Sequence, residues 1–347
     1  MRRVLRWLGR GVLGLLLLVL LLLSPVAYVE TACRPQGEAA PYASILPDAD
    51  RRPESRTLMT YPEWHIVHAY DDYARVIRNG DPQDYGFLRG IGGFWSSLCA
   101  LSRASGAYGG VDGGTKQMVY VIGTSFTLEL ALKAAYEETL GRAVTWIRGP
   151  THAAADAISA RQAADYATFL RQTPWYRWDF RRDAAELQTA GDSFRDRERA
   201  MALGLEYRAK AAYAKAIEAA VANVGPDALR LKMVVTGLPD GFLAARPDIT
   251  LIETRPEGMV IETPRYAALT RLLVDMAEAG ADFVEIAGND DIMFTATSDQ
   301  PEQPGALTSM ARQGYGDYRH LIAVKVADLA ARLRDLGPLK LEHIHDY

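Results

Sequence analysis

The chain has very little cysteine and no excess of positive charge, and both scarcities limit what it can be. Its 347 residues contain two cysteines, Cys33 and Cys99. Two cysteines cannot build the disulfide framework of a small secreted domain or a cysteine-based zinc site. Beyond the first ten residues the chain holds 35 basic and 43 acidic residues, a formal charge of −8. Because nucleic-acid binding depends on neutralising phosphates, this balance argues against a nucleic-acid partner.

The sequence also lacks the short motifs that mark well-known catalytic sites. It contains no Gly-x-Ser-x-Gly elbow, Walker sequence, His-Glu-x-x-His, EF-hand loop or dinucleotide-binding glycine pattern. The glycine-rich stretches at 90–93 and 109–114 lack the lysine or the strand-turn-helix setting that phosphate binding needs. These absences identify no cofactor and leave open whether the protein is an enzyme.

A long apolar run is present near the N-terminus. Residues 12–29 carry no charged side chain and follow four arginines within the first ten residues. As a helix these residues span about 27 Å, close to the ~30 Å hydrocarbon core of a bilayer. The arginines place the N-terminus in the cytoplasm by the positive-inside rule. We therefore expect residues 1–30 to be a single-pass anchor in the bacterial inner membrane, with the bulk of the chain in the periplasm.

Two alternatives to a retained anchor remain open. A cleaved signal peptide also begins with arginines and an apolar run, but no Ala-x-Ala cleavage site follows here. The Thr31-Ala32-Cys33 stretch resembles the end of a lipoprotein signal with Cys33 as the lipidated residue, although Glu30 stands where an aliphatic residue is required. Cys33 falls in a proline-rich segment and Cys99 in a predicted helix, so we do not expect these two cysteines to pair.

Changes in residue pattern divide the rest of the chain into three parts. Residues 31–56 carry four prolines and no periodic pattern, which predicts a flexible tether. Residues 57–224 have helical periodicity and predict a helical domain. Residues 225–347 have short β-rich runs around two helices, and a Gly288-Asn289 turn predicts a hairpin. We expect an α+β sandwich with ferredoxin-like topology here. The predicted helices of the middle part are 62–78, 87–102, 115–147, 160–172 and 195–224, with Pro62 in the first turn of its helix.

A glutamate and a lysine recur in two similar helical phrases. LELALKAAY at 128–136 and LEYRAKAAY at 205–213 match at six of nine positions. At 100° per residue, the glutamate of each phrase turns toward the buried side of its helix, with a lysine and a tyrosine beside it. We expect the two pairs to form one network where the helices cross. It is either a structural network or a polar pocket in which a carboxylate of raised pKa acts as a general base. The candidate residues are Glu129, Lys133, Tyr136, Glu206, Lys210 and Tyr213.

Histidines supply weaker candidates for a metal site. His65, His68 and Asp72 lie within about 60° on one helical wheel, a spacing that suits metal ligation, but they lie opposite the expected buried side. We therefore favour a solvated or interdomain face for them. His343 and His345 alternate with Leu339 and Leu341 along the last strand, and His320 on a neighbouring strand is the expected third ligand. The alternative is a frayed strand with both histidines at the surface.

An aromatic and basic segment, TPWYRWDFRR at 173–182, also has two interpretations. Aromatic rings mixed with arginines suit the headgroup region of a membrane. The same residues suit a loop that fills the core of the helical part, which is the interpretation that we favour.

These patterns predict a membrane-anchored extracytoplasmic protein of the bacterial cell envelope. A binding or scaffolding role with a partner protein or apolar ligand fits the absence of catalytic motifs. The alternative is an envelope enzyme that uses the Glu/Lys/Tyr centre or, with a bound metal, the histidines.

Overall fold

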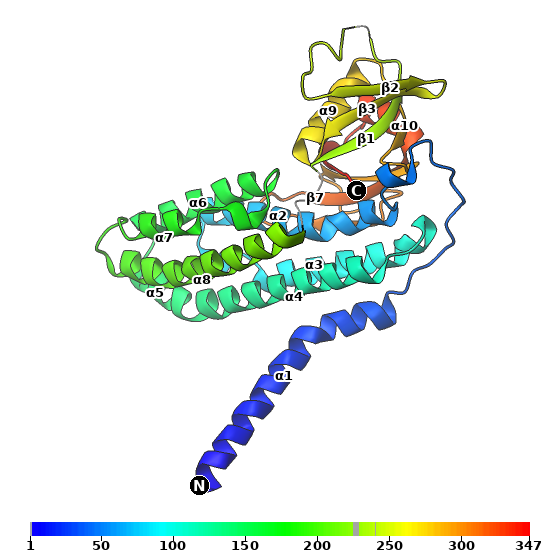
Figure 1. The fold of residues 1–347 in the computed structure, drawn as a ribbon. Coiled ribbons are helices and arrows are strands. Elements are labelled where there is room, and N and C mark those ends of the chain that lie inside the picture. The colour runs from blue at the N-terminus through cyan, green and yellow to red at the C-terminus, as the bar shows by residue number, and fades with distance from the viewer. Residues whose placement is uncertain (1, 225–228, 240) are drawn as a thin grey trace.

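A bundle of helices lies between a projecting N-terminal helix and a smaller part that contains the sheets. The computed structural model describes residues 2–224, 229–239 and 241–347, and the architecture is given for these residues. Figure 1 shows helix α1 (Arg2–Ala32) projecting from one side of the bundle, with the sheets on the opposite side. The chain therefore contains both helices and sheets, as expected, with an apolar helix at its N-terminal end.

The helical part contains seven α-helices joined by short turns. Most begin and end near glycine, proline or aspartate; for example, the Asp112 side chain accepts a hydrogen bond from Thr115 N at 2.9 Å and caps α4. The helices are α2 (Ser55–Asn79), α3 (Phe87–Ala104), α4 (Gly113–Tyr136), α5 (Arg142–Arg148), α6 (Ala154–Leu170), α7 (Phe180–Leu187) and α8 (Phe194–Val224). The turns are η1 (Asp48–Asp50), η2 (Pro82–Asp84), η3 (Ser105–Tyr108), η4 (Glu137–Gly141) and η5 (Trp175–Arg177).

Two helices differ from their predicted extents. Helix α2 begins at Ser55, so Pro62 lies inside the helix and not in its first turn. The extra N-terminal residues are held by the sheets, because Thr57 Oγ1 donates to the His345 carbonyl at 2.7 Å. The predicted helix at 115–147 is divided into α4 and α5 by the π-helical turn η4. A side chain at Gly141 would stand 2.5 Å from the Glu137 carboxylate, so glycine allows this turn to close.

The C-terminal part contains two four-stranded antiparallel sheets of the same topology. Each is built from three strands, a helix and a fourth strand, in the spatial orders β2-β3-β1-β4 and β6-β7-β5-β8. Each also has a bulge where its first and fourth strands pair, at Val234/Val235 and at Thr295/Ala296. The first unit is β1 (Arg230–Thr236), β2 (Thr250–Arg255), β3 (Gly258–Pro264), α9 (Ala267–Glu278) and β4 (Asp282–Ile286). The second is β5 (Asp291–Ser298), β6 (Thr308–Ala311), β7 (Tyr318–Lys325), α10 (Val326–Arg334) and β8 (Lys340–His345).

This arrangement differs from the predicted ferredoxin-like fold, which has a single sheet. The predicted hairpin at Gly288-Asn289 was also wrong, because β4 and β5 flank that turn but belong to different sheets. Ala287 and Gly288 both have positive φ, and Asn289 is fully buried with its side chain donating to the Ala287 carbonyl at 3.0 Å. The turn therefore sends the chain from one repeated unit into the next.

One hydrophobic core lies between the two sheets, and a second core joins the sheets to the bundle. The first contains α9, α10 and the inner faces of both sheets, with Met276 and Phe294 among its fully buried members. The second is centred on α2 and α3 and includes Met293 of β5 and Leu321 of β7. Helix α2 thus belongs to the bundle and also covers one face of the β6-β7-β5-β8 sheet.

Residues 33–54 are not the free tether that was predicted. The carboxylate of Glu285 on β4 accepts hydrogen bonds from Ile45 N at 2.6 Å and from Leu46 N at 2.8 Å. Leu46 is buried against the outer face of the first sheet, and Arg52 donates to the Tyr347 carbonyl at 2.8 Å. The prolines that suggested flexibility instead support an extended segment that covers an open sheet face.

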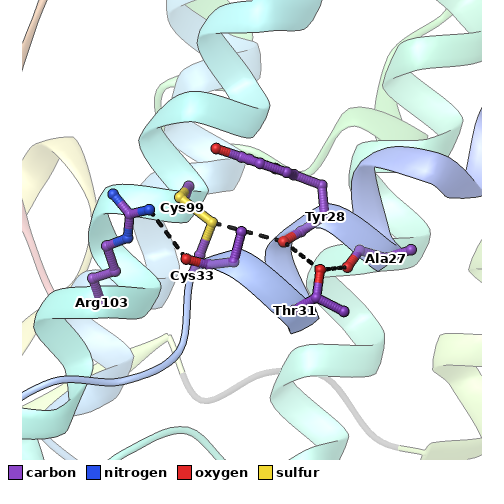
Figure 2. Close-up of a disulfide and its surroundings, with 7 residues drawn as sticks. Ala27, Tyr28, Thr31, Cys33, Cys99 and Arg103 are labelled. Atoms are coloured by element: carbon purple, nitrogen blue, oxygen red, sulfur yellow. Dashed lines mark hydrogen bonds between the residues drawn. A yellow bond between two sulfur atoms is a disulfide. The ribbon is translucent and has the colours of Figure 1, made fainter.

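The two cysteines form a disulfide, which was not expected. Figure 2 shows Cys33, just past the end of α1, bonded to Cys99 of α3, and Arg103 donates to the carbonyl of Ala32 at 3.1 Å beside it. The Cα atoms of Cys33 and Cys99 are 5.1 Å apart, and both residues are buried. The expectation was wrong because α1 continues to Ala32, so Cys33 is held next to α3 by packing.

Candidate functional site

The Glu/Lys pairs on α4 and α8 meet inside the bundle. Lys210 Nζ lies 2.8 Å from Glu129 Oε1 and 3.1 Å from Glu206 Oε1, and Lys133 Nζ lies 3.2 Å from the same Glu206 oxygen. The four side chains are half-buried. They come from α4 and α8, which lie side by side where the two similar phrases occur. The geometry is therefore the shared network that the sequence suggested.

The tyrosines of this network differ from those expected. Tyr70 of α2 donates a hydrogen bond to Glu129 and accepts one from Lys210 at 2.9 Å. Tyr136 instead donates to Glu198, and Tyr213 is exposed, with its ring 5.2 Å from that of Trp175. Sequence reasoning missed Tyr70 because it lies on a third helix, outside the repeated phrases.

Glu206 and Lys210 of this network are held in their ionised forms. Burial acts to raise the pKa of Glu206, but the ammonium groups of Lys133 and Lys210 outweigh it and hold that pKa below its usual range. Burial likewise acts to lower the pKa of Lys210, and the Glu129 charge holds it well above its usual range. A general base near neutral pH needs a raised carboxylate pKa, so the geometry favours a structural network.

Further ion pairs extend this network along the bundle. Arg199, fully buried, donates to Glu137 in the π-helical turn, and Arg195 Nε lies 2.9 Å from Asp156 Oδ1. Arg148 Nη1 lies 2.8 Å from Asp156 as well. Such buried pairs fix which helix faces which, because an unpartnered buried charge is costly.

His65, His68 and Asp72 are buried beside the sheet-containing part, so of the two faces that were expected for them the interdomain face is observed and the solvated one is not. Each is no more than 6% exposed. Helix α2 is covered by α6, α3 and α4 on its bundle side and by β5 and β8 on the other, so it has almost no solvent face. The helical wheel identified the apolar side of α2. It could not show that the sheet containing β5 and β8 covers the polar side of the same helix.

His343 and His345 also face α2. The bulge at Thr295/Ala296 puts His343 opposite Thr295 and Leu341 opposite Ala296, so the histidines turn away from the leucine core toward α2. The Trp64 ring stacks on His343 with centroids 3.4 Å apart, and the Tyr61 ring lies 5.5 Å from that of His345. His68 thus faces His343 and His345 between α2 and β8, and His65, one turn earlier on α2, packs against Phe94 and Phe126.

Several nitrogens of this histidine cluster (His65, His68, His343 and His345) have no hydrogen-bond partner in the described protein. They are His65 Nδ1, His68 Nε2, His343 Nε2 and both ring nitrogens of His345. The other His343 nitrogen lies 3.0 Å from Thr270 Oγ1. Burial lowers the pKa of His65 to about 4 and that of His345 to about 3, so these rings are neutral at pH 7. Neutral imidazole is the form that binds transition metals.

The histidine cluster does not bring three ligand atoms as close together as a bound ion requires. Among the described residues, the one group of three possible ligands within 4.8 Å of each other is Glu54, Asp290 and Asp291. Two of these carboxylates already bind Lys325, at 3.1 and 2.6 Å. A metal between α2 and β8 would therefore require the histidine rings to rotate.

His320 does not belong to the histidine cluster. Its two ring nitrogens lie 2.9 Å from Ser298 Oγ and 2.8 Å from Ser309 Oγ. Strand β5 separates its strand, β7, from β8. His68, which sequence spacing had assigned to a different site, lies near His343 and His345 instead.

A cleft of about 400 Å³ opens beside the histidine cluster, between α2, α3 and strands β6 and β7. Its polar lining includes His65, Asp72 and Arg319. Arg319 pairs with Glu342, which lies 3.6 Å from His68 Nε2. Burial raises the pKa of Asp72 to about 7 despite the nearby Arg319 charge. The cleft can therefore place a small polar ligand against an acid with a pKa near neutrality.

Glu342 and Arg319 of this site were not among the predicted residues. Their signal in the sequence is weak, because each directly precedes a histidine on a strand, and a charged residue there looks solvent-facing until the packing of α2 on the sheet is known. Comparison of the chain with protein-family models, with curated proteins and with solved structures found no match.

Proposed function

We propose that this protein is held in the bacterial inner membrane by α1 as a single span, and that its folded part serves in the periplasm as a binding or scaffolding component of the cell envelope. The observation that carries the proposal is that the end of α1 is part of the folded bundle. Residues Gly9–Ala32 are long and apolar enough to cross a membrane, with a mean hydropathy of 2.7.

The last turns of α1 make specific contacts with the bundle. Val29 is buried in the core around α2 and α3, with Val26 packed against it. The Glu30 carboxylate lies 3.2 Å from Lys116 Nζ and accepts a hydrogen bond from Tyr120 at 2.6 Å. A signal peptide is removed and adds nothing to the mature fold, so these contacts favour a retained helix.

The Cys33–Cys99 disulfide supports a location outside the cytoplasm. Stable disulfides belong to oxidising compartments, and glutathione keeps cytosolic thiols reduced. The four arginines before the span favour a cytoplasmic N-terminus. Together these features suit a short cytoplasmic end and a periplasmic bundle.

Membrane extraction and thiol labelling test the proposal. We expect the chain to stay with membranes after an alkaline carbonate wash, with its N-terminal arginines present by intact mass. Cys33 and Cys99 should react with a maleimide only after reduction. The double variant Leu17→Arg/Leu20→Arg is the control and should lose membrane association, because each arginine opposes insertion by about 3 kcal/mol. A soluble periplasmic product that starts after the apolar run would refute the anchor.

A binding role could use the cleft near Asp72, whereas the histidine cluster favours a second candidate, a metal-assisted envelope enzyme. Its buried, neutral nitrogens would be suitable ligands for a transition metal once the rings rotate to bring three of them together, and Thr270 would hold His343. In that role, Asp72 in the adjoining cleft would transfer a proton.

Cobalt binding tests this second candidate. We expect Co²⁺ added to the full chain in detergent to give visible absorption from histidine ligation, and His345→Gln to weaken binding about tenfold or more. His320→Gln is the matched control and should have no effect, because that ring binds two serines. Absorption that is absent, or unchanged in His345→Gln, would rule out the metal site.

A further inference from the structure

Helix α4 carries an exposed apolar stripe along most of its length. Met118, Val121, Leu128 and Leu132 all lie on its solvent side, and the Leu132 side chain is 63% exposed. At 100° per residue these four positions fall within about 80° of each other, so they form one continuous line. Large apolar residues arranged in a line on an exposed helix indicate an interaction surface.

The stripe contains no charged residue. From Gln117 to Ala135 the other exposed positions of α4 are Gln117, Ser125 and Ala135. The two charged residues of this span, Glu129 and Lys133, turn inward to the network with α8. Beyond the exposed Glu138–Arg142 ion pair, α5 also exposes apolar residues: Trp146 is 84% exposed, and Ile147 lies beside it. Tryptophan at the end of an apolar stripe is typical of a membrane interface.

The stripe starts where α1 meets the bundle. Leu23 and Val26 of α1 and Tyr120 and Val121 of α4 line one groove of about 530 Å³. The Cys33–Cys99 disulfide ties the end of α1 to α3, which packs on α4. In Figure 1, α3 and α4 are on the side of the bundle from which α1 extends. The bundle therefore cannot move away from a bilayer that α1 spans.

We infer that the stripe on α4 and α5 lies on the periplasmic surface of the same bilayer that α1 spans. This inference rests on the proposed anchor. The anchor leaves the membrane next to the first turns of α4, so the stripe continues an apolar surface that already meets lipid. Interfacial helices bind in this way, with one apolar face in the headgroup region.

Helix α8 carries apolar and basic side chains on an exposed face of its own. It runs beside α4 and is joined to it by the Lys133–Glu206 and Lys210–Glu129 pairs. Its exposed positions include Met201 and Leu205 together with Arg197, Arg208 and Lys215. Apolar residues with flanking cations suit an anionic membrane surface. The aromatic segment at 173–182 does not contribute, because Trp175, Tyr176 and Trp178 pack into the bundle around Phe180.

Spin labels on the full chain in lipid nanodiscs test this inference. The disulfide occupies both native cysteines, so single cysteines introduced as Val121→Cys, Leu132→Cys, Leu17→Cys or Ala157→Cys take the label alone. Ala157 is exposed on α6 and is the matched control on the same bundle. The discs contain phosphatidylethanolamine and phosphatidylglycerol. Collisions with oxygen and with a water-soluble nickel complex report whether each label is in lipid or in water.

We expect oxygen to dominate at positions 17, 121 and 132 and nickel to dominate at 157. Nickel dominating at 121 and 132 while oxygen dominates at 17 would overturn the inference and leave the anchor intact. Nickel dominating at position 17 would overturn the anchor, and the inference with it. Protection of 121 and 132 only in discs that hold two chains would also overturn the inference, because a second copy would then cover the stripe.

Discussion

Glu206 shows at the scale of one residue why the charges of the bundle depend on each other. Its Oε1 atom is within 3.2 Å of both Lys133 and Lys210, and Lys210 also contacts Glu129. Removing one carboxylate leaves a lysine in a half-buried site with too little compensating charge. The cost of such a change is dominated by the group that stays behind.

We therefore expect Glu206→Gln to destabilise the folded state by about 2 kcal/mol, below the roughly 3–5 kcal/mol of a fully buried pair because some solvent reaches these side chains. Urea unfolding of the purified chain followed by tryptophan fluorescence measures this change. Glu218→Gln, at an exposed position of the same helix, is the matched control and should alter stability by less than about 0.5 kcal/mol. Equal effects of the two substitutions would show that the network contributes little.

The pH dependence of stability tests the burial of His345. Burial is the main cause that lowers its pKa to about 3 in the folded state. Below about pH 6.5 an unfolded histidine binds a proton that the folded one does not, so His345 destabilises the fold increasingly as pH falls. We expect the stability of the native chain relative to His345→Gln to fall by about 1.4 kcal/mol per pH unit below 6.5. Groups with raised pKa values, such as Asp72, contribute equally to the stability of both proteins, so their contributions cancel in this difference.

Urea unfolding at pH 7, 6 and 5 with a chelator present gives this comparison. A constant difference between the native chain and His345→Gln across these pH values would mean that His345 titrates alike in both states. It would then be accessible to water in the folded protein.

Some of these residue roles could be predicted from the sequence. The inward direction of the Glu129 and Glu206 side chains follows from helical periodicity, because α4 and α8 are regular helices around these residues. The burial of His65 and His68 does not follow, since His65 packs against Phe94 of α3 and Phe126 of α4, and His68 is covered by a sheet more than 200 residues later in the chain. The direction of His343 depends on a one-residue bulge, and hydrophobic alternation does not reveal a bulge.

At the scale of elements, the segment after α1 shows how proline and small residues mislead. Its composition predicts flexibility, yet its backbone is bound by Glu285 and its Leu46 side chain is buried. An open sheet face needs a cover, and an extended strand-like segment provides one without a periodic pattern. A different contact, the end of α1 packing on α3, brings Cys33 to Cys99, which sequence distance alone could not indicate.

We expect removal of the disulfide by Cys33→Ala/Cys99→Ala to lower stability by about 4 kcal/mol, since a bridge between residues 66 apart restricts a long loop of the unfolded chain. Chemical unfolding of the two forms with and without reductant measures this change. Reductant should destabilise the native chain by the same amount and leave the double variant unchanged. A native chain that is insensitive to reductant would show that the end of α1 is held by packing alone.

At the scale of the whole molecule, α2 makes the helical and sheet-containing parts one structure. The sequence divides them near residue 225, where the residue pattern changes. The core of the bundle nevertheless includes Met293 and Leu321 from the second sheet. Thr57 is fully buried, donates to the His345 carbonyl at 2.7 Å and accepts from Met293 N at 3.0 Å. The residue pattern shows where helical segments give way to β-rich segments. It does not show which residues make contacts across that boundary.

We therefore expect the helical and sheet-containing parts to unfold in a single transition. Hydrogen exchange under increasing urea should give the same opening free energy for the amides of α6 and for those of β1 and β5. Thr57→Val leaves a buried carbonyl and a buried amide without partners and should lower both values together by about 2 kcal/mol. Thr168→Val, at an exposed position of α6, is the matched control and should lower neither. If Thr57→Val lowered protection in β5 while α6 kept its own, the two parts would be independent domains, and α2 would only rest against the sheet that it covers.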